Sequence, residues 1–215
     1  MFYQRRIVKK LIGAHEDFKD TWKLVMKKAD IEMTKELARA VKYFLSKHPG
    51  VCDHCEDCRH RTQPFSPLHI GAEAGQTSLC EFILKITEDK NPSLISFDIG
   101  WTPLHEAAQE GHLLICYMIM NEITDKNPGD IYGITPLHGA AAKGQLETFK
   151  LIMDKVTDIN PRDNEGWTPL HEAARRGYKE LCEFITNNVE DKNPEDDRGW
   201  TPKDLMWNKI CGSDV

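Results

Sequence analysis

The stretch Trp101-Thr102-Pro103-Leu104-His105-Glu106-Ala107-Ala108-Gln109-Glu110-Gly111 decides the fold, because the chain repeats it. Closely matching copies begin at Ile134 and Trp167, a weaker copy begins at Phe65, and a shortened one begins at Trp200. The prolines of these copies, at positions 67, 103, 136, 169 and 202, lie 36, 33, 33 and 33 residues apart. A fixed period of this length is the sequence signature of a solenoid, in which each repeat packs on its neighbours.

Each copy carries the signals of a short helix. A threonine that can cap the first turn through its hydroxyl precedes the proline in three copies: Thr102, Thr135 and Thr168. The proline then takes the first helical position, where its missing N–H costs nothing. A glycine suited to a left-handed helix end closes the same three copies: Gly111, Gly144 and Gly177. The pattern therefore predicts one short helix in each copy.

A second helix is predicted after each of these glycines. In one copy the apolar residues at helical spacing are Leu113, Ile115, Cys116 and Ile119. A turn rich in Asp, Asn and Pro then leads to the next copy. The motif and its period closely resemble the ankyrin repeat, from about Arg61 to the C-terminus. The resemblance implies an all-α ankyrin-repeat solenoid of four repeats and a degenerate C-terminal half repeat.

The remaining part of the chain precedes the repeats, and we place the boundary between residues 1–60 and 61–215. The full chain has a net charge of −6, but residues 1–60 carry an excess of four basic residues and residues 61–215 an excess of ten acidic ones. Helical patterns at about 15–28 and 31–47 predict a short helical N-terminal segment. This segment either caps the solenoid or binds a partner through Trp22.

A Cys-rich loop at residues 51–60 is the one stretch whose pattern could hold a metal. Cys52, Cys55, Cys58 and His60 have thiolate and imidazole ligands suited to tetrahedral zinc, with His54 as another possible fourth ligand. Structural zinc sites usually join two separated ligand pairs, and here all candidates crowd into one loop. A metal-free acidic loop with incidental thiols is therefore the other interpretation.

Three further cysteines are expected to be small buried apolar residues. Cys80, Cys116 and Cys182 each lie 13 residues after the proline of their repeat, and Phe149 has that place in another. Equivalent helices in a stack lie about 8–10 Å apart, beyond the reach of a disulfide. We therefore expect a reducing compartment, the cytoplasm foremost, with the nucleus also open.

Several classes of function are disfavoured by the sequence. An acidic repeat array is a poor binder of nucleic acid, and no apolar run is long enough to cross a membrane. No set of residues suggests a nucleophile with its base, and no Gly-rich phosphate loop is present, so we expect no enzyme. The resemblance implies that the motif histidine bonds to backbone and ties neighbouring turns together in each repeat: His69, His105, His138 and His171.

The resemblance also implies the function, a non-catalytic intracellular scaffold that is monomeric and binds a protein partner through a concave face. In ankyrin repeats the turn tips and the ends of the first helices make the contacts. Mapped onto this chain, the predicted turn contacts are Ile99, Trp101, Ile131, Tyr132, Ile134, Glu165, Trp167, Arg198 and Trp200. The predicted helix-end contacts are Gln109, Glu110, Lys143, Arg175 and Arg176. We expect Tyr132 and Arg176 to contribute most, since aromatic and Arg side chains dominate binding hot spots.

The aromatic residues before each Thr-Pro pair have two open interpretations. Trp101, Trp167 and Trp200 occupy one repeat position, shared with Phe65 and Ile134. Their rings either pack on the adjacent turn or form an exposed stripe for a partner. The alternative function for the whole chain is a zinc-binding adaptor, in which the Cys-rich loop is a metal module and the repeats recruit a client.

Overall fold

The repeat motif forms paired helices in the computed structural model, which describes residues 67–92 and 100–211. These described residues contain nine α-helices and no strand, as the resemblance to the ankyrin repeat implied. The chain divides into two compact units, Met1–Pro103 and Leu104–Val215. The predicted boundary near residue 60, the helices at 15–28 and 31–47, and the Cys-rich loop lie outside the described residues.

In the first unit, helix α4 (Pro67–Glu73) packs on helix α5 (Thr77–Ile86). Their shared core is made by Leu68, Ile70, Ala72, Leu79, Cys80, Ile83 and Leu84, all buried. His69 lies in this core, and its Nε2 is 3.1 Å from the backbone oxygen of Trp101. The weaker first copy of the motif therefore still builds a helix pair with its histidine tied to a backbone carbonyl.

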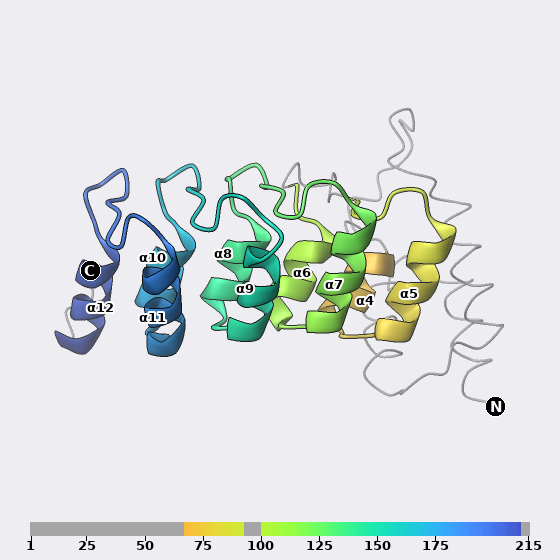
Figure 1. Cartoon of the computed structure of the whole chain (residues 1–215), viewed down its shortest axis with the longest axis horizontal. Coiled ribbons are helices and arrows are strands. Elements are labelled where there is room, and N and C mark those ends of the chain that lie inside the picture. Colours follow the sequence, from red (N-terminus) through yellow and green to blue (C-terminus); the bar gives the residue numbers. More distant parts are fainter. Residues whose placement is uncertain (1–66, 93–99, 212–215) are drawn as a thin grey trace, which may run out of the picture. The chain divides into compact units, whose positions relative to one another are not determined.

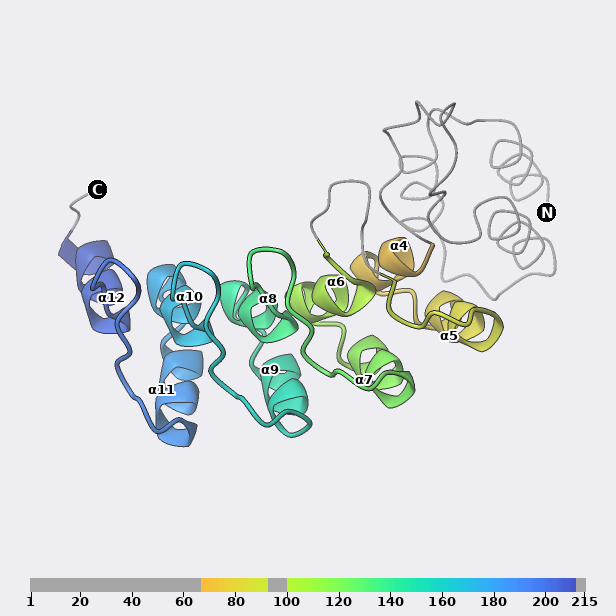
Figure 2. The same cartoon turned by 90° about the horizontal axis from the view of Figure 1, so that it is seen from above.

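The second unit stacks three complete helix pairs and one further helix. The pairs are α6 (Pro103–Glu110) with α7 (Leu113–Glu122), α8 (Pro136–Ala142) with α9 (Leu146–Met153), and α10 (Pro169–Arg176) with α11 (Lys179–Asn188). Helix α12 (Pro202–Cys211) follows. Within this unit α6, α8, α10 and α12 form an inner row, and α7, α9 and α11 form an outer row (Figure 2).

The core of the second unit explains why the motif has these residues. The leucine of each motif is almost fully buried, with exposures of 0% for Leu104, 0% for Leu137 and 2% for Leu170. The Ala-Ala pairs are fully buried between the helices. The outer helices contribute Ile115, Cys116, Ile119, Phe149, Ile152, Leu181 and Ile185. The period of 33 residues thus returns the same small and large side chains to the same interface in every repeat.

The predicted helix ends are also present. Gly111, Gly144 and Gly177 have φ angles of 78°, 69° and 80°, a left-handed conformation that L side chains rarely adopt. At the other end, His138 at the third helical position accepts a hydrogen bond from the N–H of Thr135 through Nδ1, at 3.2 Å. The reciprocal bond from the His138 backbone to the Thr135 hydroxyl completes a capping box.

Candidate functional site

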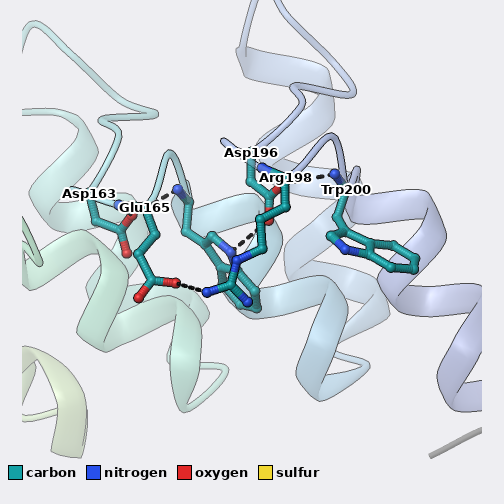
Figure 3. A network of polar contacts seen from close by, with 6 residues as sticks. Asp163, Glu165, Asp196, Arg198 and Trp200 are labelled. Atoms are coloured by element: carbon teal, nitrogen blue, oxygen red, sulfur yellow. Dashed lines mark hydrogen bonds and ion pairs between the residues drawn. The ribbon is translucent and has the colours of Figure 1, made fainter. Parts of the chain in front are cut away.

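The extended turns between repeats project on the same side of the helices in the second unit (Figure 1). We call them fingers: finger 130–134, finger 163–167 and finger 196–200. Each begins with an aspartate whose Oδ1 accepts two backbone N–H groups of its own finger. Asp163, for example, accepts from Glu165 at 2.9 Å and from Trp167 at 2.8 Å (Figure 3). Asp130 and Asp196 make the equivalent bonds, so every finger closes as the same tight turn.

Neighbouring fingers are also bonded to each other. The backbone N–H of Asn164 donates to the carbonyl of Tyr132, and its side-chain Nδ2 donates to the carbonyl of Ile131, both at 2.8 Å. One repeat further on, the N–H of Asp197 donates to the carbonyl of Glu165 at 3.1 Å. These bonds fix the backbone of each tip before any partner arrives. We call the three tip pairs Ile131–Tyr132, Asn164–Glu165 and Asp197–Arg198 the fingertip row.

The motif histidines hold the fingers to the helices. The Nε2 atoms of His105, His138 and His171 each lie 3.1 Å from a backbone oxygen 29 residues further on. Because a backbone N–H can only donate, the Nδ1 of His138 that accepts it carries no proton, and Nε2 is therefore the N–H donor. The structural role expected for these histidines is confirmed.

Burial keeps these imidazoles neutral. It lowers the pKa of His105 from its usual 6.5 to about 4. Burial likewise lowers the pKa of His138 and of His171. Protonation of Nδ1 would remove the acceptor for the capping N–H, so the same geometry that ties the repeats together disfavours the charged form.

The aromatic position before Thr-Pro has both of the predicted environments. Trp167 donates from Nε1 to Oδ2 of Asp196 at 2.9 Å and stacks on His171, with ring centroids 5.8 Å apart. The guanidinium of Arg175 lies 5.5 Å from the Trp167 ring centroid. Trp101 and Ile134 are also only partly exposed, whereas Trp200 is 40% exposed. Trp167 therefore packs within the stack of fingers, and Trp200 is available on the surface.

The carboxylate that receives the Trp167 indole is itself buried. Desolvation raises the pKa of Asp196, but hydrogen bonds from the backbone N–H groups of Trp200 and Arg198 and from the Trp167 indole outweigh it and bring the pKa below its ordinary value. Asp196 is thus a charged acceptor at neutral pH, which strengthens each of these bonds.

The predicted helix-end contacts lie on the surface but are partly engaged with one another. Glu110 is 4.0 Å from Lys143 of the next repeat and accepts from Gln109 at 3.4 Å. Arg175 forms an ion pair with Glu172 at 2.8 Å, and Arg176 is exposed. Exposed ion pairs of this kind are weak, so these side chains can still exchange their neighbours for a partner.

The tip of finger 130–134 differs from the other tips. Ile131 is 50% exposed and Tyr132 is 56% exposed, whereas the corresponding residues are Asn164 and Glu165, then Asp197 and Arg198. A turn tip usually carries polar residues, so two adjacent apolar side chains held outward are unusual. The structure thus places the two predicted apolar contacts side by side at the start of the fingertip row. Ile99 lies outside the described residues.

A second apolar surface was missed by the sequence reasoning. On the outward side of α7, Leu113 is 45%, Leu114 56% and Tyr117 47% exposed. Leu113 belongs to the apolar run that predicted this helix, yet only Ile115, Cys116 and Ile119 of that run are buried. The sequence does indicate that these two positions face outward, because charged residues stand at the same repeat positions in the other outer helices. Leu114 and Tyr117 correspond to Glu147 and Lys150 in α9 and to Glu180 and Glu183 in α11.

Three thiols of the repeats are structural. Cys80, Cys116 and Cys182 are free and buried, and burial raises their pKa values to about 12, 12 and 11. Such thiols are poor nucleophiles and poor metal ligands. No group of His, Cys, Asp or Glu within residues 67–92 and 100–211 could hold a metal ion. The predicted zinc ligands Cys52, Cys55, Cys58 and His60 lie outside these ranges.

The family of the chain follows from its repeats and from sequence comparison. No helix among the described residues is long and apolar enough to span a bilayer. No curated protein matches the chain. The family model described as "Ankyrin repeats (3 copies)" matches residues 33–130 and 115–197. Together these matches cover most of the sequence, and the chain belongs to the ankyrin-repeat family.

Proposed function

We propose that this chain is a non-catalytic protein-binding module that recognises a protein partner through the fingertip row. The observation that supports this most is the apolar tip of finger 130–134, where Ile131 and Tyr132 are half exposed on a fixed backbone. The carbonyl of each residue accepts a bond from Asn164, and the N–H of Tyr132 donates to Asp130. Apolar side chains presented on a rigid backbone lose little entropy on binding.

The surroundings of Tyr132 suit a binding hot spot. The polar tips Asn164–Glu165 and Asp197–Arg198 continue from it along the row, so polar groups border the apolar tip on that side, as in the polar rim of an interface. The inner-helix ends with Lys143, Arg175 and Arg176 supply charged groups for the rim. A partner with an apolar side chain flanked by acidic and basic groups fits this arrangement. The buried, free thiols agree with action in a reducing compartment, the cytoplasm or the nucleus.

The test uses two tyrosines of similar exposure on different surfaces. Proteins captured by the tagged full-length chain are identified, and the affinity of the recovered partner is measured for Tyr132→Ala and Tyr117→Ala. Tyr132→Ala is expected to weaken binding about 5- to 30-fold, because truncation of an interface aromatic costs about 1–2 kcal/mol. Tyr117→Ala should bind like the unmodified chain, and both variants should melt at its temperature.

The reverse outcome would move the interface. If Tyr117→Ala lost affinity and Tyr132→Ala did not, the partner would bind the outward side of α7 instead. A loss with both variants would contradict a site confined to the fingertips. Arg176→Ala is the second variant, since Arg176 is exposed at the end of α10 and we expect it to contribute to the rim.

The zinc-binding adaptor stays a separate hypothesis about residues 51–60. Elemental analysis of the full chain, purified without chelator, distinguishes a zinc-binding loop from a metal-free loop with incidental thiols. About one zinc per chain, with a loop that becomes protease-sensitive once the metal is stripped, would support a metal module. A metal-free chain with an unchanged digestion pattern would leave the incidental-thiol interpretation.

A further inference from the structure

Finger 196–200 presents, open to solvent, the two groups with which finger 163–167 holds its neighbour. In finger 163–167, the indole N–H of Trp167 donates to Asp196, and the carbonyl of Glu165 accepts the N–H of Asp197. The corresponding groups in finger 196–200 are the indole of Trp200 and the carbonyl of Arg198 (Figure 3). Among the described residues, nothing accepts from the Trp200 indole, whose side chain is exposed.

The space beside the glycine of each finger shows that finger 163–167 is covered by its neighbour and that finger 196–200 is open. A Cβ added at Gly166 would lie 2.6 Å from Oδ1 and 2.8 Å from the backbone nitrogen of Asp197. A Cβ added at Gly199 would have no described atom within 4 Å. The surface that receives Asp196–Asp197 in the interior is therefore vacant at Gly199. We call the residues Arg198, Gly199 and Trp200 the open edge.

Helix α12 lacks the features that would join a further ankyrin repeat to this edge. Asp204 stands where the other repeats have the histidine that donates to the next finger. It accepts instead from the N–H of Thr201 at 3.0 Å and from the Thr201 hydroxyl at 2.5 Å. Lys203 replaces the buried leucine and is exposed. The open edge keeps the finger-to-finger groups while the helix has lost the tie, so it fits a lone turn better than a whole repeat.

We propose that the open edge binds an aspartate-bearing turn of a protein partner. The partner carboxylate accepts the Trp200 indole N–H, as Asp196 accepts that of Trp167, and the next backbone N–H donates to the carbonyl of Arg198. This extends the proposed function by naming the chemistry of one contact, and it depends on the chain being a protein-binding module.

The charge at the open edge favours this occupant. Arg198 stands where the interior finger has Glu165, so the open edge offers a guanidinium to an acidic turn where the interior surface offers a carboxylate. Arg198 and Glu165 pair at 3.4 Å with side chains that are 72% and 66% exposed, and a pair so exposed is weak. Arg198 can therefore turn to a ligand carboxylate at little cost.

The probe for this site is the chain's own finger. A cyclised peptide of residues 193–201 carries the Asp196–Asp197 pair that docks on Trp167 in the folded protein. It is added to the 15N-labelled full-length chain, and the indole N–H signals of the five tryptophans are followed by NMR. The Trp200 signal is expected to shift and saturate, while the Trp167 signal stays in place because Asp196 already holds that indole.

Two matched changes isolate the recognised groups. The Asp196→Ala peptide should bind at least about tenfold more weakly than the unmodified peptide, because it lacks the charged acceptor. In the protein, Trp200→Phe keeps a large ring and removes the indole N–H. The backbone amide signals of Arg198 and Gly199 should then no longer shift when the peptide is added, while the melting temperature of the protein is unchanged. Trp200→Phe also assigns the indole signal.

Each other outcome would overturn the proposal. If the Trp200 indole signal did not shift at the highest soluble peptide concentration, or shifted equally with the alanine peptide, the open edge would not recognise an aspartate. A Trp200 signal that moves with protein concentration as the mass doubles would assign the edge to a second copy. One that ignores the peptide but moves when residues 212–215 are deleted would assign it to the chain's own tail. None of these results bears on the Tyr132→Ala test, so the two proposals fail separately.

Discussion

Finger 163–167 and finger 196–200 share their aspartate, glycine and tryptophan in the sequences Asp163-Asn164-Glu165-Gly166-Trp167 and Asp196-Asp197-Arg198-Gly199-Trp200. Their internal bonds match as well, with each aspartate accepting at 2.9 and 2.8 Å from its own finger. Yet one tryptophan is hydrogen-bonded within the stack and the other is 40% exposed. The shape of a finger is therefore local, whereas its role depends on the repeat beside it.

The largest difference between interior and last repeat is expected in the core. Leu137→Ala should cost about 2–5 kcal/mol, because Leu137 is 0% exposed and its loss leaves a cavity. Lys203→Ala, at the same repeat position in α12, should change stability by less than about 0.5 kcal/mol. Urea denaturation followed by circular dichroism measures both. Equal effects would contradict the assignment of α12 as a solvent-facing end of the stack.

The histidine ties predict a pH dependence that the last repeat does not share. Unfolded His105 binds a proton below about pH 6.5, whereas in the folded protein burial holds its pKa at about 4. The stabilisation is therefore complete above pH 6.5 and is lost as the pH falls toward 4. Between pH 7 and pH 5, His105 alone should account for about 2 kcal/mol of lost stability.

Urea midpoints at pH 7 and pH 5 measure this loss, and His105→Gln is the matched variant. It should be less stable than the unmodified chain at pH 7 but lose less on acidification. A variant with the same pH slope as the unmodified chain would show that other groups cause the acid sensitivity.

Two glycines sharpen the comparison of the fingers. Gly166 and Gly199 both have left-handed φ angles, 79° and 81°, so alanine should cost about 1–2 kcal/mol of backbone strain at either position. At Gly166 the added Cβ would also press on the backbone of Asp197, so Gly166→Ala should cost at least about 1 kcal/mol more than Gly199→Ala. Thermal melts of the two variants compare them. Indistinguishable melts would mean that the last finger is covered like the interior one.

The sequence predicted those features that a repeat determines by itself. The proline period located the helices, the threonines and glycines located their ends, and the leucines and alanines predicted the core. The family resemblance added the role of His105, His138 and His171. All of these depend on contacts within one repeat or with a neighbour of the same sequence, so a regular period was enough to predict them.

The features that the sequence left open depend on departures from the repeat. Trp167 and Trp200 share a motif position, but Asp196, His171 and Arg175 contact the Trp167 ring, whereas the repeat of Trp200 has Asp204 in place of the histidine. The sequence predicted Arg175 as a contact for a partner, but in the structure it forms an ion pair with Glu172 and its guanidinium lies over the Trp167 ring. The exposure of Tyr117 on α7 was not predicted, because Tyr117 lies within an apolar run and helical spacing alone does not show which apolar residues face outward.

Amide hydrogen exchange of the full-length chain, alone and with the captured partner, locates the binding surface without any substitution. If the fingertip row is the binding surface, exchange should slow in the segment Gly129–Ile134 when the partner is present, and α7 (Leu113–Glu122) should exchange as before. Slower exchange at Leu113–Tyr117, with the fingertips unchanged, would place the partner on the outer helices and contradict the function proposed for the fingers.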